Sequence, residues 1–323
     1  MTIVPKILPS IQKDLLILEK NLQKMVSAKH PILYAAAEHL FSAGGKRIRP
    51  TIILLIAFAT TKTLNILPEH KRLAEITEII HTASLVHDDV IDECATRRGV
   101  NTVHNTFSTK VAVLAGDFLF AQSSWYLANL NNLEVVKAIS KVITDFAEGE
   151  VRQSLTCFDA DISMDNYIEK SFYKTASLIA SSCKAAAILS ETSPNIQNQF
   201  YLYGKHLGLA FQIVDDILDI IGSQVSLGKP AGSDLKNGNL TAPLIFALQE
   251  NSTLYTFIER EFEQNNDIAK TIEIIKNSNS IQKSYDLAQE HIQASIQAIN
   301  KINNNLAQES LSHISNYVIK RLN

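Results

Sequence analysis

Two clusters of aspartates interrupt otherwise apolar stretches of the chain, and they limit what it can fold into. The first reads SLVHDDVIDE at 84–93 and the second FQIVDDILDI at 211–220. On a helix, residues four apart share a face, so the first and last aspartates of each cluster lie together. Burying such charges without cations would cost far more than the marginal stability of a domain allows. The two helices are therefore expected to face each other across metal ions.

Carboxylates in this arrangement are typical of a magnesium site. Mg²⁺ prefers oxygen ligands and usually combines one or two carboxylates with phosphate oxygens of a substrate. A single motif of this kind is more often a solvated acidic face, but the flanking residues Leu85, Val86 and Val90 are not those of an exposed helix. The second aspartate cluster, in another apolar stretch, favours the metal-site interpretation over a solvated acidic face. The candidate ligands are Asp88, Asp89, Asp92, Asp215, Asp216 and Asp219.

Glycine and proline are scarce, with 11 and 8 copies in 323 residues, and no stretch alternates convincingly as a strand would. The chain is therefore predicted to be all-α, with one domain over 1–323, because it shows no repeat or linker. Helical spacing covers 10–42, a helix entered at Pro50, 70–94, 109–130, 132–155, 164–190 and 197–222. A loop is expected at 228–243, followed by a helical C-terminal third that is broken at 264–267 and 277–280.

Charge and cysteine content exclude several classes of partner. A net charge of −3 and a pI of about 6.3 argue against nucleic acid. Three cysteines without a CxxC pair favour reduced thiols over disulfides or zinc. The longest apolar run, TIILLIAFAT at 51–60, is too short to span a bilayer. The N-terminus resembles neither a signal nor a transit peptide, so a protein of an organelle would be made there or have lost its presequence.

Basic residues supply the opposite charge. Each alone is more often a surface charge, but beside two acidic motifs they suggest one diphosphate held through metal and a second held directly by Arg and Lys. At a helix start, backbone N–H groups also favour anions. The candidates are Lys46, Arg47 and Arg49 in AGGKRIRP, Arg97 and Arg98 after the first acidic cluster, Lys174 in YKTAS and Lys229 in GKPAG.

With these motifs assembled, the sequence resembles the trans-type polyprenyl diphosphate synthases. The matching segments run from 43 to 243 and are AGGKRIRP, HTASLVHDDVIDECATRRG, GDFLFAQ, YKTASL, FQIVDDILD and GKPAGSDLKNGNLTAP. HPILYAAAEHLF and ISNYVIKRL extend the likeness over essentially the whole chain. GDFLFAQSSWYLANL and GNLTAPLIFAL are most similar to the solanesyl-type synthases of cyanobacteria and plastids, which make the side chain of plastoquinone.

The resemblance implies a helical bundle around a central cavity, a homodimer, and a place in the plastid stroma or a cyanobacterial cytoplasm. It also implies two or three Mg²⁺ ions, which the six aspartates hold together with an allylic diphosphate. Arg97, Lys174 and Lys229 would support that diphosphate, with Thr175 and Gln212 beside the reacting carbons. Lys46, Arg49, His81 and Arg98 would bind isopentenyl diphosphate. Pyrophosphate leaves, isopentenyl diphosphate attacks the allylic cation, and apolar walls exclude water.

One position departs from the family pattern. Many members carry a second lysine where this chain has Asn239, which brings no charge. Lys236, three residues earlier, is the nearby cation that could compensate.

Product length is suggested by the residues one turn before Asp88. In this family a bulky residue there stops growth early, whereas this chain has Ala83 and Ser84. The resemblance therefore implies a long product, about C40–C50; the alternative is that the small residues there serve only close helix packing. The candidates for a deeper floor are Phe118, Phe120, Gln122, Trp125 and Tyr126, and the sequence does not choose among them.

Three alternatives share part of this pattern. A terpene cyclase would have an Asn/Ser/Glu-type second metal motif and no basic isopentenyl site, unlike DDILD and AGGKRIRP here. A non-catalytic regulatory subunit commonly loses aspartates from one motif, and both are intact. A shorter-chain synthase of the geranylgeranyl type would use the same chemistry with a shallower tunnel.

Overall fold

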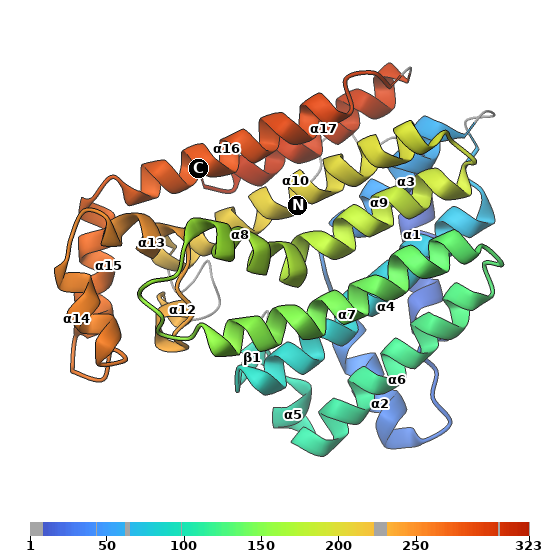
Figure 1. The fold of residues 1–323 in the computed structure, drawn as a ribbon. Coiled ribbons are helices and arrows are strands. Elements are labelled where there is room, and N and C mark those ends of the chain that lie inside the picture. Colours follow the sequence, from blue (N-terminus) through green and yellow to red (C-terminus); the bar gives the residue numbers. More distant parts are fainter. Residues whose placement is uncertain are drawn as a thin grey trace. The chain divides into compact units, whose positions relative to one another are not determined.

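The computed structural model describes residues 9–42, 44–61, 65–97, 99–222, 231–302 and 304–322. It confirms the all-α prediction, since Figure 1 shows helices almost throughout. Strands within the described residues are limited to β1 (Thr96–Arg97) and β2 (Val100–Asn101), which pair antiparallel with Arg97 opposite Val100. None of the described helices combines the length and hydropathy needed to cross a membrane.

The chain forms two compact units. The first comprises Met1–Val142, Leu178–Leu202 and Ala298–Ile314, and the second Ile143–Ser177, Tyr203–Gln297 and Ser315–Asn323. The expectation of one domain over 1–323 remains a prediction.

The first unit contains the helices up to the first acidic cluster and those packed around it. They are α1 (Pro9–Met25), α2 (Pro31–Ser42), α3 (Ile48–Thr60), α4 (Pro68–Ile91), α5 (Val103–Thr106) and α6 (Thr109–Ala128), with the start of α7 (Leu133–Leu155), most of α9 (Ser177–Leu189), the start of α10 (Pro194–Ile221) and the first part of α17 (Asn305–Lys320). Helix α3 is buried from Pro50 to Ala57. Gly116 of α6 lies so close to His87 of α4 that an added Cβ would meet its ring Nε2 at 2.2 Å. This glycine brings α6 against the helix that carries the first aspartates.

The second unit holds the remaining elements and the second acidic cluster. They are the rest of α7, α10 and α17, α8 (Met164–Ser171), the π-helix η1 (Phe172–Ala176), α12 (Ser233–Lys236), α13 (Ala242–Leu248), α14 (Thr253–Glu259), α15 (Asp267–Asn277) and most of α16 (Ser280–Ala298). Gly208 of α10 lies against Ala176, where an added Cβ would be 2.5 Å from its Cα. Close packing of α10 on η1 follows, and it positions the side chains discussed below.

Three predicted elements differ from the structure. The helix expected over 10–42 breaks between α1 and α2, because the residue before Pro31 is disfavoured in the helical conformation. The helix expected over 164–190 contains η1, a one-turn widening that periodicity does not reveal. The loop expected at 228–243 contains the short helix α12, while 223–230 lie outside the described residues.

Candidate active site

The first acidic cluster lies at the C-terminal end of α4. The helix ends at Ile91, one residue before Asp92, but the Asp92 N–H still donates to the Asp88 carbonyl at 2.8 Å. Asp92 therefore stays one turn beyond Asp88, as the spacing predicted. Asp88 and Asp92 are half-buried, whereas Asp89 is 3% exposed. The cluster combines accessible carboxylates with one that needs a partner inside the protein.

Arg97 on β1 is the partner of Asp89. Its Nε donates to Asp89 Oδ1 at 2.7 Å, and its Nη2 lies 2.6 Å from the same oxygen. Burial opposes the charge of Arg97, but the hydrogen bond and charge of Asp89 outweigh it, so the pKa of Arg97 rises above its ordinary value. Arg97 is thus fixed beside the predicted metal ligands. Arg98 lies outside the described residues.

A pocket in the first unit joins this pair to the predicted isopentenyl site. Its lining includes Glu78, His81, Leu85, Asp89 and Arg97 from α4 and β1. Arg49 Nη1 is 3.0 Å from His81 Nε2, and because a guanidinium can only donate, the histidine nitrogen accepts. The structure thus brings together two of the residues predicted to bind isopentenyl diphosphate, and their role stays a prediction. Lys46 is exposed at the turn before α3.

Glu78 was not identified from the sequence as the buried partner of Arg47 in this pocket. This carboxylate is 5% exposed and accepts from Arg47 Nη1 at 2.5 Å, while both residues line the pocket. Arg47 has a left-handed backbone with φ 50° at the start of α3, which is rare for a residue with a side chain. The acidic residues of LAEITEII at 73–80, within a buried helix, were the available signal.

The second cluster lies in α10, where Asp216 is 2% exposed. Tyr167 donates its OH to Asp216 Oδ2 at 2.5 Å, and Gln212 Nε2 donates to Oδ1 at 2.8 Å. Thr175 in η1 donates to Gln212 Oε1 at 2.6 Å. The predicted trio Thr175, Gln212 and Asp216 therefore forms one hydrogen-bonded chain, to which Tyr167 is an addition that the sequence did not suggest.

The other two aspartates of this cluster have separate partners. Asp219 accepts from Ser233 Oγ at 2.8 Å and from the Asp234 N–H, so it fixes the start of α12. Asp215 is paired with Arg321, whose Nη2 lies 2.6 Å from Asp215 Oδ1. Near the C-terminus, Arg321 gave no sequence signal that linked it to this site.

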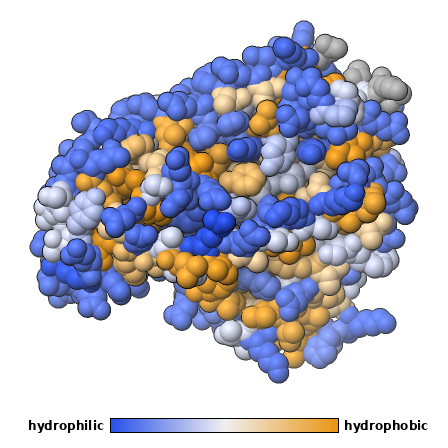
Figure 2. Space-filling model, viewed as in Figure 1, coloured by the Kyte–Doolittle hydropathy of each residue, from blue (hydrophilic) through white to orange (hydrophobic). Residues whose placement is uncertain are grey.

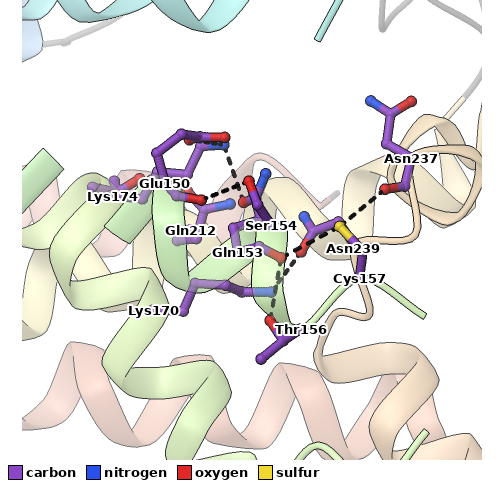
Figure 3. Close-up of polar contacts among 11 residues, drawn as sticks. Glu150, Gln153, Ser154, Thr156, Cys157, Lys170, Lys174, Gln212, Asn237 and Asn239 are labelled. Atoms are coloured by element: carbon purple, nitrogen blue, oxygen red, sulfur yellow. Dashed lines mark hydrogen bonds and ion pairs between the residues drawn. The ribbon is translucent and has the colours of Figure 1, made fainter. Parts of the chain in front are cut away.

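Lys174, predicted to support the allylic diphosphate, lies in η1 within a polar network drawn in Figure 3. Its Nζ donates to Gln153 Oε1 at 3.2 Å and lies 3.5 Å from Glu150 Oε2. These contacts hold Lys174 beside Gln153 and Glu150, in the group of polar residues that Figure 3 draws together with Gln212. Lys229 lies outside the described residues.

The donor set can be tested against Mg²⁺. Within the described ranges, no three His, Cys, Asp or Glu side chains lie close enough together to form a metal site alone. Mg²⁺ needs fewer protein ligands than such a cluster provides, because one or two carboxylates, substrate phosphates and waters complete its coordination shell. In the first unit, the half-buried carboxylates of Asp88 and Asp92 fit that requirement, and in the second unit the half-buried carboxylate of Asp215 does.

The geometry can be compared with known proteins. Residues 30–275 match the family described as polyprenyl synthetase. The chain belongs to this family. A Porphyra purpurea prenyl transferase is 59% identical over 312 residues, which cover 97% of this chain and 97% of that protein. Rice (Oryza sativa subsp. japonica) solanesyl-diphosphate synthase 2, chloroplastic, is 49% identical over 322 residues, covering 99% of this chain and 80% of that protein.

Among solved structures, a polyprenyl synthase from Caulobacter crescentus CB15, complexed with calcium and isoprenyl diphosphate, has a TM-score of 0.90. It is 31% identical and covers 96% of this chain and 95% of its own. A solved polyprenyl synthase fold therefore covers 96% of this chain.

Asp216 predicts a pH-dependent contribution to stability. The pKa of Asp216 is raised from 3.8 to about 8, first by burial and then by the negative charge of Asp234. Hydrogen bonds from Tyr167 and Gln212 lower the pKa and offset part of this rise. Because the folded chain holds this proton more tightly than the unfolded chain, the free energy of unfolding falls as pH rises between these values. Asp216→Asn, which carries no charge, should be stabilised relative to wild type by a margin that grows with pH. Melting temperatures in metal-free buffer at pH 5 to 9 test this, and parallel pH profiles would contradict it.

Proposed function

We propose that this polyprenyl synthetase is a chain-elongating trans-prenyltransferase that condenses isopentenyl diphosphate with an allylic diphosphate. The observation that carries the proposal is that both acidic clusters are intact and that one carboxylate of each cluster forms an ion pair with an arginine. A separate Arg49–His81 pair, 3.0 Å apart, adds a cationic group for the second diphosphate. The Caulobacter relative, solved with calcium and isoprenyl diphosphate, supports a divalent metal, here Mg²⁺, with two or three ions as the expected number.

The residues of this chain would divide the work. Bound Mg²⁺ supplies charge stabilisation for the departing pyrophosphate. Asp88 and Asp92 of the first cluster and Asp215 of the second are proposed as its ligands, and Arg97 and Lys174 as ligands of the allylic diphosphate. Arg49 and His81, with Lys46, bind isopentenyl diphosphate. Thr175 and Gln212 orient the reacting carbons, and released pyrophosphate is the base that takes the final proton.

Pyrophosphate release separates this function from its alternatives. A condensing synthase releases pyrophosphate from an allylic diphosphate at full rate only when isopentenyl diphosphate is present. A cyclase would release it from the allylic substrate alone, and a regulatory subunit would release none. An assay with a farnesyl or geranylgeranyl primer, with and without isopentenyl diphosphate, therefore tests the proposal.

For the product, we infer a long chain of about C40–C50, suited to the nonaprenyl side chain of plastoquinone. The name of the rice relative, a solanesyl-diphosphate synthase, supports this length. On α4, Ala83 is fully buried and Ser84 is half-buried. Because both side chains are small, neither places a bulky group in the path of a growing chain. On α6, Phe118, Phe120, Gln122 and Tyr126 are half-buried, whereas Trp125 is 60% exposed.

Ala83→Phe should shorten the product, because a ring one turn before Asp88 would block the growing tail. Since Ala83 is fully buried, overpacking should cost about 1–3 kcal/mol of stability as well. Ser84→Phe, at a half-buried position, is the milder variant for the same test. Chromatographic sizing of the products checks both. Unchanged product lengths in two folded variants would show that these residues do not line the tunnel.

We further infer a homodimer and a location in the plastid stroma, or in the cytoplasm of a cyanobacterium-like cell. On α6, Leu114 and Trp125 are 51% and 60% exposed and, eleven residues apart, lie on nearly the same face. Figure 2 shows hydrophobic side chains gathered over this part of the first unit. The chloroplastic rice relative supports the location. Sedimentation of the purified chain tests the dimer.

A further inference from the structure

Lys170 is a buried cation that the proposed mechanism does not yet use. It lies at the end of α8 with 7% of its surface exposed. Its Nζ donates to Asn239 Oδ1 at 2.5 Å, so its hydrogen-bond partner is a neutral amide rather than a carboxylate. Burying an ammonium group is costly unless an anion balances it. A buried ammonium group that donates to an amide, with carboxylates acting on it only from further away, can accept an anionic ligand.

The surroundings of Lys170 indicate where that anion would lie. Burial lowers the pKa of Lys170, Asp216 and Asp234 attract its proton, and Lys174 repels it. Lys170 and Lys174 are four residues apart along α8 and η1, the spacing at which like charges destabilise a helix. Figure 3 draws both lysines within the same polar network. A polyanion that contacts both ammonium groups would relieve this repulsion.

Asn239 holds the ammonium group of Lys170 through its side-chain oxygen. Because the two side chains meet, a lysine at position 239 would place its charge close to where Lys170 now places one. Lys236, the compensating cation suggested by the sequence, is instead exposed at the end of α12. Lys170 thus brings a positive charge from α8 to the side chain of Asn239.

On this basis, and resting on the proposed function, we propose that Lys170 is a diphosphate-binding residue of the allylic site, with Asn239 as its positioning residue. Lys170→Met removes the charge while keeping an unbranched side chain. Titration calorimetry with inorganic pyrophosphate in Mg²⁺ buffer should then show an affinity lower by about tenfold or more. The KM for the allylic diphosphate should rise, whereas the KM for isopentenyl diphosphate should stay unchanged.

A relocated lysine makes the test specific. Lys170→Met with Asn239→Lys returns an ammonium group to the same place and should recover most of the lost pyrophosphate affinity. Lys276→Met, at an exposed position of α15, is the matched control and should bind as wild type does. Lys170→Gln keeps a donor for Asn239 and should show the same loss even if Lys170→Met does not fold.

Three results would overturn the assignment. They are unchanged pyrophosphate affinity in folded Lys170→Met or Lys170→Gln, a loss that Asn239→Lys does not recover, and an equal loss on Lys236→Met. Each can be found while wild type still elongates its primer, so failure of this inference is distinguishable from failure of the proposed function.

Discussion

Asp88→Ala is expected to lower the rate of elongation by about a thousandfold while the chain stays folded. Asp88 is half-buried on the last turn of α4, next to Asp89, which is buried and paired with the half-buried Arg97. Losing a ligand to the metal that stabilises departing pyrophosphate removes several kcal/mol from transition-state stabilisation, and each 1.36 kcal/mol is about tenfold in rate. Steady-state kinetics with circular dichroism of the variant measures both parts of the expectation.

The matched control for this variant is Glu69→Ala. Glu69 is an exposed acid in the first turn of the same helix α4. Its loss should cost at most about 1 kcal/mol of stability, from its interaction with the helix dipole, and should leave turnover unchanged. Near-normal turnover in Asp88→Ala would refute the metal assignment.

Asp215→Ala is expected to produce a loss of similar size in the second unit. Asp215 has a second role to separate from catalysis, because its Oδ1 lies 2.6 Å from Arg321 Nη2. Arg321 also stacks over Phe211, with its guanidinium carbon 4.6 Å from the ring centroid. If Asp215 holds metal, removing Asp215 should lower the rate by orders of magnitude, whereas Arg321→Ala should lower it far less.

Stability measurements complete this comparison. Both substitutions break the same ion pair, and Arg321→Ala also removes the stacking on Phe211, so Arg321→Ala should lower the melting temperature at least as much as Asp215→Ala while lowering the rate far less. Equal losses of rate in the two variants would show instead that Asp215 matters through its pairing with Arg321.

Much of the fold and part of the site could be read from the sequence. Helical periodicity and few glycines and prolines predict the helix class because burial repeats every three to four residues. The spacing in DDxxD predicts which aspartates share a face because it depends on local geometry alone. Pairs such as Thr175 with Gln212 were suggested through family resemblance, and the structure brings them within 2.6 Å.

The remaining features depend on contacts between distant segments. Arg321 pairs with Asp215 from near the C-terminus, and no local pattern records that pairing. Lys170 reads as an ordinary helix lysine until its burial and its contact with Asn239 are seen. The widening of the helix at η1 likewise has no glycine or proline to indicate it, and its last residue, Ala176, packs closely on Gly208 of α10.

The most direct test of the central claim is product sizing with the purified wild-type chain. It is incubated with labelled isopentenyl diphosphate, Mg²⁺ and allylic primers of several lengths, and the products are separated by chain length. We expect label in a long all-trans polyprenyl diphosphate, of about C40–C50, that is lost when the metal is chelated. Absence of elongation with every primer would contradict the account.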